Sequence, residues 1–435
     1  MRSRSDQPTQ TQSRGWLFSA RPGLASRLLA LLAGAALLVS GTALAQTTVN
    51  YFSFTTGSDQ IDALEALIAT FERANPGIRI NYTTADFGSY FTKLQTDFAA
   101  GNAPDVFELN YENFVTFASR GTLLEVDGLL SASANLGAET FYPAALEAFS
   151  YEGKQLGLPI TFSTVLLFYN QELFDAAGLD YPTDAWSWDD VISAGAAITD
   201  APNRVWGISQ PVQFWEFYKT AAQAGGGLSV SPAVRIDTPE NRAAAHYLVD
   251  KVQVHGIMPS DAEMSGVGDV DLFANGQLGM LVTGIWMFDF FINNADFAWD
   301  IAVEPGGANQ ATHFFSNAAV IANTTVVAEA AWKWVEFLAA DPAVAATRIE
   351  RSWELSALSL EHADVLAAYL SRPVPANREA VFRSLQFAVN PPVVENQPQL
   401  QDIINQELEA ARLGTKTVEQ ALADAQRRVE ALVNE

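Results

Sequence analysis

Few of the side chains that carry out enzymatic chemistry stand at catalytic spacings in this sequence. No G-x-S-x-G, H-E-x-x-H or G-x-x-x-x-G-K-S/T motif is present, so the signatures of α/β-hydrolases, zinc proteases and P-loop proteins are missing. Cysteine is absent, which excludes thiol catalysis, zinc–thiolate sites and disulfides. The histidines do not pair at metal-ligand spacing; they are His246, His255, His313 and His362. We therefore expect no cofactor and no metal site.

Carboxylates are the one abundant reactive group, with 50 Asp and Glu residues. Asp189 and Asp190 stand together where a helix is expected to begin, and acidic residues at that position interact favourably with the helix dipole. We therefore interpret this pair as structural. A glycoside hydrolase needs only two carboxylates that face each other across a cleft. A glycoside-active enzyme accordingly stays open as the leading enzymatic alternative.

Acidic, amide and aromatic side chains follow three predicted strands in the first third of the chain. β-Branched and aromatic residues predict strands at 48–54, 78–82 and 105–109, and apolar residues at helical spacing predict helices at 61–71 and 87–100. This alternation is typical of a parallel sheet covered by helices, in which ligands lie beyond the carboxyl ends of the strands. The candidate ligand-binding residues there are Phe54, Asp86, Phe87, Tyr111, Glu112 and Asn113.

These residue types can hold a small neutral ligand that has hydroxyl groups. Carboxylates and amides hydrogen-bond to hydroxyl groups, and Asp86 and Glu112 are the best acceptors among them. Aromatic faces cover patches of C–H. Arginine is scarce near the candidate loops, which argues against an anionic ligand, because such ligands usually take arginine clamps.

The strand–helix alternation resumes after residue 165. Strands are predicted at 165–169, 205–209 and 278–282, and helices at 188–198, 213–225, 239–254, 327–340, 399–413 and 417–433. Thr417 and Gln420 have the spacing of a capping box at the start of the last helix. No internal repeat or flexible linker divides the chain. The sequence therefore predicts an α/β fold whose parts are joined by short crossovers.

Size and composition indicate a globular protein of two domains. The chain has 435 residues, too many for one core of ordinary size. Apolar residues make up 49% and charged residues 17%, which argues against disorder. The formal net charge of −25 argues against a nucleic-acid partner. Ten tryptophans exceed what packing usually needs and point to a surface or cleft that uses flat rings.

The first 45 residues have the pattern of a cleavable export signal. Arginines precede a short apolar run, LLALLAGAALLV, and Ala43-Leu44-Ala45 supplies the small residues of a cleavage site. The apolar run is short for a membrane span. We expect cleavage before Gln46 and a mature protein that lies outside the cytoplasmic membrane, in the periplasm or an equivalent compartment. Without cysteine it cannot be a lipoprotein of the usual kind.

Four stretches of the mature chain carry a family pattern. Residues 71–110 combine N-P-G, K-L-Q and G-x-x-P-D-V, and residues 153–191 read G-K-x-x-G-L-P, Y-N and L-F-x-x-A-G-L. The other two are FANGQLGMLVTGIW at 273–286 and EAAWKWVEFLAADPAV at 329–344. Together they resemble the family 1 extracellular solute-binding proteins, the sugar receptors of ABC importers typified by the maltose-binding protein. One departure is Leu156, where the family often has Tyr.

The resemblance implies a two-lobed α/β fold of the type II periplasmic-binding-protein class. Each lobe would hold a mostly parallel sheet flanked by helices, and a hinge would close the lobes on the ligand. Crossovers are expected near 160–163, 311–316 and 353–357. The N-terminal lobe would comprise 46–162 and 314–354, and the C-terminal lobe 163–313 and 355–435.

The implied activity is capture of a mono- or oligosaccharide without catalysis. A monomer would deliver the sugar to membrane permease subunits of an ABC importer. A receptor of the same fold for a polyol, a peptide or an amino-acid derivative stays open as an alternative.

The resemblance also adds candidates for ligand binding. Trp286 matches the family's stacking tryptophan, Trp215 stands where the family places another ring, and Ser163 matches a position that often faces the ligand. Three further candidates lie at the expected crossovers: His313, Ser316 and Trp353. We expect Trp286 to stack on a sugar face, because the preceding glycine lets backbone and ring approach a ligand closely.

Overall fold

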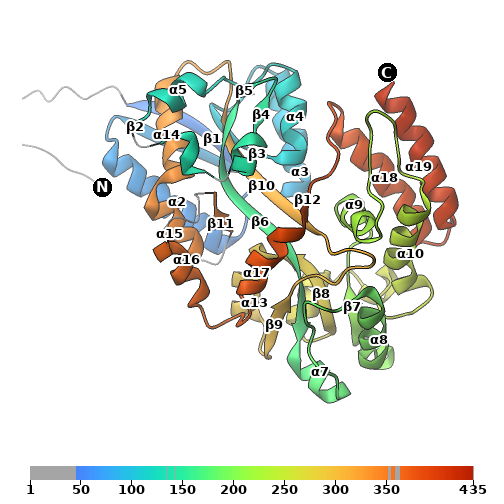
Figure 1. Cartoon of the computed structure of the whole chain (residues 1–435). Coiled ribbons are helices and arrows are strands. Elements are labelled where there is room, and N and C mark those ends of the chain that lie inside the picture. The colour runs from blue at the N-terminus through green and yellow to red at the C-terminus, as the bar shows by residue number, and fades with distance from the viewer. Residues whose placement is uncertain (1–45, 135, 142, 351–353, 358–362, 435) are drawn as a thin grey trace, which may run out of the picture. The chain divides into compact units, whose positions relative to one another are not determined.

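Residues 46–134, 136–141, 143–350, 354–357 and 363–434 are described by the computed structural model of the protein (Figure 1). The predicted export signal at 1–45 and Trp353 lie outside the described residues. The chain from Thr47 onward groups into one unit by its contacts.

The first part of the sheet confirms the predicted strand–helix alternation. Three strands pair in parallel in the order β2-β1-β3, and two helices connect them. β2 buries Ile78 and Ile80 while Arg79 and Asn81 are exposed, because successive side chains of a strand point to opposite faces. The elements are β1 (Thr47–Ser53), α2 (Ser58–Ala74), β2 (Ile78–Thr84), α3 (Phe87–Ala99) and β3 (Val106–Asn110).

Two long strands run through the middle of the sheet. β6 (Gly157–Asn170) has all 14 residues buried, and β10 (Thr312–Ile321) lies between β3 and β6, antiparallel to both. The strand order is β2-β1-β3-β10-β6-β8-β7, where β7 is Trp206–Ser209 and β8 is Leu278–Gly284. The sheet is therefore mixed. It is parallel among β1–β3 and at β7–β8, as predicted, and antiparallel where β3 and β6 pair with β10.

The second part of the sheet continues from the far half of β6. β8 (Leu278–Gly284) and β9 (Trp299–Ala302) pair with it antiparallel, and β7 (Trp206–Ser209) joins β8 in parallel. The strand predicted at 165–169 is the end of β6 rather than a separate strand. The helices there begin and end within a few residues of the prediction: α8 (Trp188–Ile198), α9 (Phe214–Gln223) and α10 (Pro239–Gln253).

Helix starts follow their predicted capping chemistry. Asp189 and Asp190 lie in the first turn of α8, where Asp190 forms a capping box with Ser187, so the structural interpretation of this acidic pair is confirmed. Thr417 and Gln420 form the predicted capping box of α19 (Val418–Val433).

The buried side chains of β6 belong to different cores along its length. Leu158 and Ile160 pack with Val49 of β1 and Trp334 of α14 (Ala328–Ala340), whereas Phe162 and the residues after it pack with the later strands. Each end of this strand thus belongs to a separate hydrophobic core, as a two-lobed fold requires. The full lobe boundaries given above remain a prediction.

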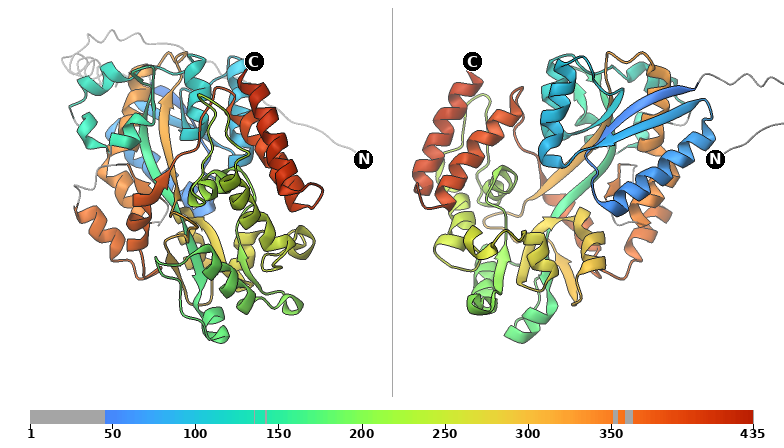
Figure 2. Two further views of the ribbon diagram at one scale, coloured as in Figure 1. Left: turned by 45° about the vertical axis from the view of Figure 1, so that its right-hand side comes forward. Right: turned by 180° about the vertical axis from the view of Figure 1, so that it is seen from behind.

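The last two helices pack beside α9 and α10 (Figure 2). Leu400 and Leu408 of α18 (Gln397–Arg412) share a core with Phe214 of α9 and Leu248 of α10. The predicted helices at 399–413 and 417–433 are therefore confirmed, and they cover an apolar surface built much earlier in the chain.

Shorter elements complete the described part of the chain. Within it, no helix has both the length and the hydropathy that a bilayer crossing requires. The remaining elements are α4 (Tyr111–Ser119), α5 (Asp127–Ala132), α6 (Pro143–Glu147), β4 (Ser150–Tyr151), β5 (Lys154–Gln155), α7 (Gln171–Ala177), α11 (Asp261–Met264), α12 (Asp269–Ala274), α13 (Phe288–Asn294), α15 (Pro342–Glu350), β11 (Leu355–Ser356), α16 (Ala363–Leu370), α17 (Glu379–Ser384), β12 (Ala388–Val389) and short 3-10 turns.

Candidate functional site

One face of the β6–β10 pair gathers several of the predicted ligand residues. Ser163 on β6 lies directly opposite Phe315 on β10, and His313 stands two residues earlier on the same face. The rings of Phe315 and His313 stack, and Trp286 meets Phe315 edge-to-face with 5.4 Å between ring centroids. Ser163, Trp286 and His313 are thus brought together around Phe315, a residue that the sequence reasoning missed.

Gly284 determines how the Trp286 ring lies. β8 ends at Gly284, and a turn of 3-10 helix over Ile285–Met287 carries the indole. A Cβ atom at position 284 would lie 1.9 Å from the Trp286 ring. The indole therefore rests directly on the glycine backbone. It is only partly buried, so part of the ring is accessible.

Glu112 supplies the polar part of the site. It lies in the first turn of α4, which begins directly after β3. Asn110 Nδ2 donates to Glu112 Oε2 at 2.6 Å, and Asn113 Nδ2 donates to Asn110 Oδ1 at 2.8 Å. Burial and the neighbouring Glu112 raise the pKa of the partly buried Tyr111. Glu112 is thus a buried hydrogen-bond acceptor. Its carboxylate is oriented by the Asn110 amide, which is in turn held by Asn113.

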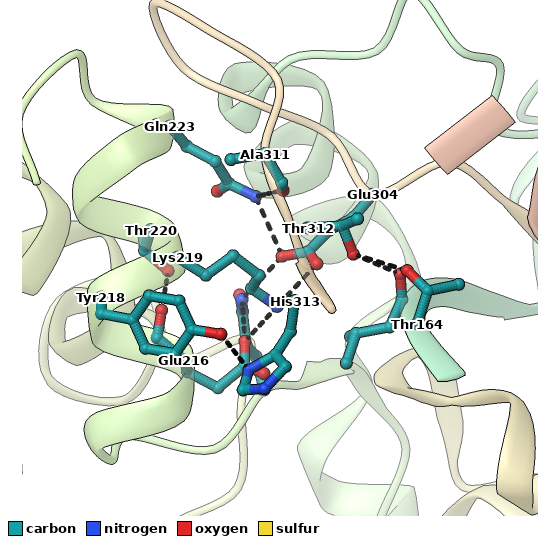
Figure 3. A network of polar contacts seen from close by, with 12 residues as sticks. Thr164, Glu216, Tyr218, Lys219, Thr220, Gln223, Glu304, Ala311, Thr312 and His313 are labelled. Atoms are coloured by element: carbon teal, nitrogen blue, oxygen red, sulfur yellow. Dashed lines mark hydrogen bonds and ion pairs between the residues drawn. The ribbon is translucent and has the colours of Figure 1, made fainter. Parts of the chain in front are cut away.

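His313 joins Glu112 to a second helix. His313 Nε2 lies 2.9 Å from Glu112 Oε1, and the hydroxyl of Tyr218 on α9 is hydrogen-bonded to His313 Nδ1 (Figure 3). Burial lowers the pKa of His313. Both ring nitrogens have protein partners in this structure, so neither is free for a ligand. Within the described ranges, no three acidic or histidine side chains are grouped to hold a metal ion.

Three other candidates form a row of aromatic rings. Phe87 meets Phe54 edge-to-face at 5.5 Å and Trp215 of α9 at 6.4 Å between centroids. Phe87 is 41% exposed, which is unusual for so large an apolar ring. The adjacent Asp86 caps α3, because its Oδ1 accepts the Ser89 N–H at 3.1 Å. Hydrogen bonds from Ser89 lower the pKa of Asp86, which stays exposed at the end of this row.

Ser316 is not brought to this group. It is one residue from Phe315, so its side chain points to the opposite face of β10. Its hydroxyl is buried and donates to the Thr161 carbonyl oxygen at 3.4 Å. Trp353, the remaining candidate, is outside the described residues.

Glu354 is an acidic residue that the sequence reasoning missed. Asn317 Nδ2 donates to Glu354 Oε1 at 3.3 Å and to Thr161 Oγ1 at 3.1 Å, on the face of β10 that also carries Phe315. Burial raises the pKa of Glu354, against the lowering effect of Arg348. Glu354 follows the candidate Trp353 in the sequence and lies within the expected crossover at 353–357, so its position could have identified it as a candidate site residue.

A cluster of buried charges, formed by two residues of α9 and by Glu304, was also missed by the sequence reasoning (Figure 3). Lys219 Nζ lies 2.9 Å from Glu216 Oε2 and 2.6 Å from Glu304 Oε2, and none of these side chains is more than 7% exposed. Burial raises the pKa of Glu304 to about 7 although Lys219 opposes the shift. Burial lowers the pKa of Lys219, but the two carboxylates outweigh it and the net shift is upward.

Buried amides extend this charge cluster. Gln223 Nε2 donates to Glu304 Oε1 at 3.1 Å and to the Ala311 carbonyl oxygen at 2.8 Å. Gln210 Nε2 donates to Glu216 Oε2 at 2.7 Å, and Lys251 Nζ donates to Gln210 Oε1 at 2.8 Å. The cluster therefore ties α9, which carries Trp215 and Tyr218, to the segment that leads into His313. The sequence contains a signal for this cluster, because Glu216 and Lys219 stand three residues apart on a helix with many apolar residues.

Comparison with known proteins identifies the family. Residues 57–345 match the bacterial extracellular solute-binding protein family. The chain belongs to this family. The resemblance predicted from the four sequence stretches is thereby confirmed.

Relatives of this solute-binding protein include a solved complex. An ABC substrate-binding protein of Listeria monocytogenes, in complex with cycloalternan, has 41% sequence identity and a TM-score of 0.86 over 89% of this chain and 99% of its own. A putative binding protein of Brucella abortus (strain 2308) is 23% identical over 423 residues, 93% of this chain and 97% of its own. An arabinooligosaccharide-binding protein of Halalkalibacterium halodurans is 22% identical over 265 residues, 58% of this chain and 57% of its own.

The structural similarity confirms the predicted fold class of this family member. A TM-score of 0.86 over nearly the whole described part places it among two-lobed α/β binding proteins. The family is one of substrate-binding proteins rather than enzymes.

Proposed function

We propose that this solute-binding protein captures a sugar outside the cytoplasmic membrane and delivers it to the permease of an ABC importer. The observation that carries the proposal is the 41% identity, over 89% of the chain, with the Listeria monocytogenes protein whose structure contains cycloalternan. The arabinooligosaccharide-binding relative is consistent with a carbohydrate ligand.

The geometry around Phe315 supports a sugar as ligand. Trp286 offers a partly accessible ring, Glu112 offers a carboxylate held by amides, and Phe87 and Trp215 offer further aromatic surface. Sugars present both C–H faces, which pack on rings, and hydroxyl groups, which hydrogen-bond to carboxylates. We propose Phe54, Asp86, Phe87, Tyr111, Glu112, Asn113, Ser163, Trp215, Trp286, His313, Ser316 and Trp353 as the residues to test, with Glu354 added from the structure.

A sugar panel tests the proposal. We expect tryptophan fluorescence to change on titration with one or a few mono- or oligosaccharides, and native mass spectrometry of protein purified without refolding to reveal a co-purified carbohydrate. A response only to polyols, peptides or amino-acid derivatives would contradict a sugar receptor while keeping the binding function. Turnover of a bound oligosaccharide would instead support a glycoside-active enzyme.

We propose that a monomer performs the binding by closing two lobes, 46–162 with 314–354 and 163–313 with 355–435. β6 and β10 contribute side chains to more than one core, which supports a hinge at these strands. Closure around a ligand is the usual motion of such two-domain receptors.

Export is proposed to remove residues 1–45. The mature N-terminus should then be Gln46, one residue before β1 begins at Thr47. We expect N-terminal sequencing and intact-mass analysis of the exported protein to give this start and no lipid. A mass that retains Ala43-Leu44-Ala45 would show that the signal is kept.

A further inference from the structure

A short strand brings Glu354 to the candidate site. β11 pairs antiparallel with β6 on the side away from β10, with Leu355 opposite Phe162. The same register places the preceding residue, Glu354, opposite Ser163, and Ser163 has Phe315 opposite it on β10. Residues that stand opposite each other on neighbouring strands share one face of a sheet. Glu354 therefore lies on the same face as Phe315, with β6 between them.

Hydrogen-bond donors and a cation surround the Glu354 carboxylate. Asn317 Nδ2 donates to Glu354 Oε1 at 3.3 Å, and Arg348 Nη1 of α15 lies 4.0 Å from Glu354 Oε2. The hydroxyl groups of Thr161 and Ser163 favour the charged form of the carboxylate. The Glu354 side chain is 12% exposed and that of Arg348 is 4% exposed. The carboxylate is thus the more accessible member of this ion pair.

Arg348 also acts on a second buried carboxylate. Glu108 of β3 is buried, and the hydroxyl of Tyr51 on β1 donates a hydrogen bond to Glu108 Oε1. Burial raises the pKa of Glu108, the Tyr51 hydroxyl and Arg348 lower it, and the charge of Glu354 raises it. The two carboxylates thus share one buried cation, so removal of that cation leaves both without its compensating charge.

We propose that Glu354 accepts a hydrogen bond from a hydroxyl group of the bound sugar, and that Arg348, anchored by Glu108, is the positioning residue that holds this carboxylate in place. The contact with a sugar rests on the proposed function. Hydrogen bonds to a charged acceptor are roughly twice as strong as those between neutral groups. Because Arg348 is almost fully buried, it acts through Glu354 rather than on the sugar itself.

Sugar binding is expected to weaken in acid through Glu354. Burial raises the pKa of Glu354 above the value of about 4.3 for an ordinary glutamate, although Arg348 lowers it. The charged acceptor is therefore complete at neutral pH and is lost as the pH falls through the raised pKa. The ionisable groups that act on Glu354 are Arg348 of α15 and Glu108 of β3, while β6 and β10 contribute the uncharged Thr161 and Asn317.

The affinity measured across pH tests the role of Glu354. The probe is the sugar that gives the largest change in tryptophan fluorescence in the panel, titrated by calorimetry from pH 8 to pH 5. Glu354→Gln keeps the shape of the side chain but cannot ionise. We expect it to bind roughly tenfold or more weakly at pH 8 and to lose the fall in affinity in acid. Glu329→Gln, at an exposed glutamate in the first turn of α14, is the matched control and should bind like wild type.

Substitutions of Arg348 separate positioning from stability alone. Arg348→Met removes the charge, so the pKa of Glu354 should rise and the affinity should begin to fall at a higher pH. Arg348→Lys restores a cation and should return the pH profile toward that of wild type. If Arg348→Met does not fold, Glu108→Gln takes its place: Arg348 then acts on Glu354 alone, and the fall in affinity should move to lower pH. A purely structural role would reduce the folded fraction without moving the pH profile of the folded molecules.

Three results would overturn the proposal while wild type still binds the sugar. One is Glu354→Gln binding as tightly as wild type at pH 8. Another is a fall in the affinity of Glu354→Gln in acid as large as that of wild type, which would assign the effect to another group such as Glu112. The third is a pH profile that Arg348→Met and Glu108→Gln both leave unmoved. Binding of no sugar by wild type would instead overturn the proposed function, and the contact of Glu354 with a sugar together with it.

Discussion

Replacing Trp286 by alanine is expected to weaken sugar binding by at least roughly thirtyfold while changing stability little. Loss of one aromatic anchor at an interface typically costs about 2 kcal/mol or more, and about 1.4 kcal/mol is a factor of ten in affinity. The ring is only partly buried and rests on Gly284 and Phe315. Calorimetric titration with the sugar found in the panel, together with thermal melting, measures both effects.

A buried tryptophan provides the matched control. Trp206 is 2% exposed and packs in the core with Leu278, so Trp206→Ala should cost about 3–5 kcal/mol of stability and leave the affinity per folded molecule unchanged. Gly284→Ala should weaken binding too, since its new methyl group would displace the Trp286 ring. If Trp286→Ala instead behaves like Trp206→Ala, Trp286 is a core residue and not a ligand platform.

Replacing Lys219 by methionine is expected to destabilise the protein by about 3–5 kcal/mol, because removal of one partner leaves buried charges uncompensated. Glu216 and Glu304 would then lie buried without the ammonium that contacts both. Chemical denaturation of both proteins at pH 8, above the pKa of about 7 for Glu304, gives the change in the free energy of unfolding.

An exposed lysine serves as the comparison for Lys219. Lys154 lies 3.2 Å from Glu125, and both side chains are more than half exposed. Such surface ion pairs contribute at most about 1 kcal/mol, so Lys154→Met should be nearly neutral. Equal effects of the two substitutions would show that the buried cluster does not depend on Lys219.

The elements predicted well are those whose signals are local. α8 and α19 begin at capping boxes that can be read from neighbouring residues, and β2 alternates buried and exposed side chains. β6 was found only in part, since a strand with every residue buried shows no alternation. The position of β10 between β3 and β6 depends on pairing across the whole chain, which local patterns do not carry.

The residues of the candidate site were also predictable only where their signals are local. Trp286, Ser163 and Glu112 could be named in advance because each stands at a strand end or in a family stretch. The contacts of these residues could not be predicted, because they join distant segments: Glu112 and His313 are separated by 201 positions. Lys219 was missed for a related reason. A lysine in a helix normally predicts a solvent-exposed position, and only the arrival of Glu304 makes its burial tolerable.

The position of β10 in the sheet also determines when the sheet can be completed during synthesis of the chain. β3 and β6 both pair with this strand, so one edge of each stays unpaired until the chain has been synthesised as far as Ile321. A nascent chain that stops short of it presents two strand edges with unpaired backbone groups, which are templates for aggregation. The N-terminal part expressed alone should therefore precipitate rather than fold. Conversely, a chain that cannot complete its sheet early stays unfolded for longer during synthesis, the state in which a polypeptide can still be threaded through a narrow export channel.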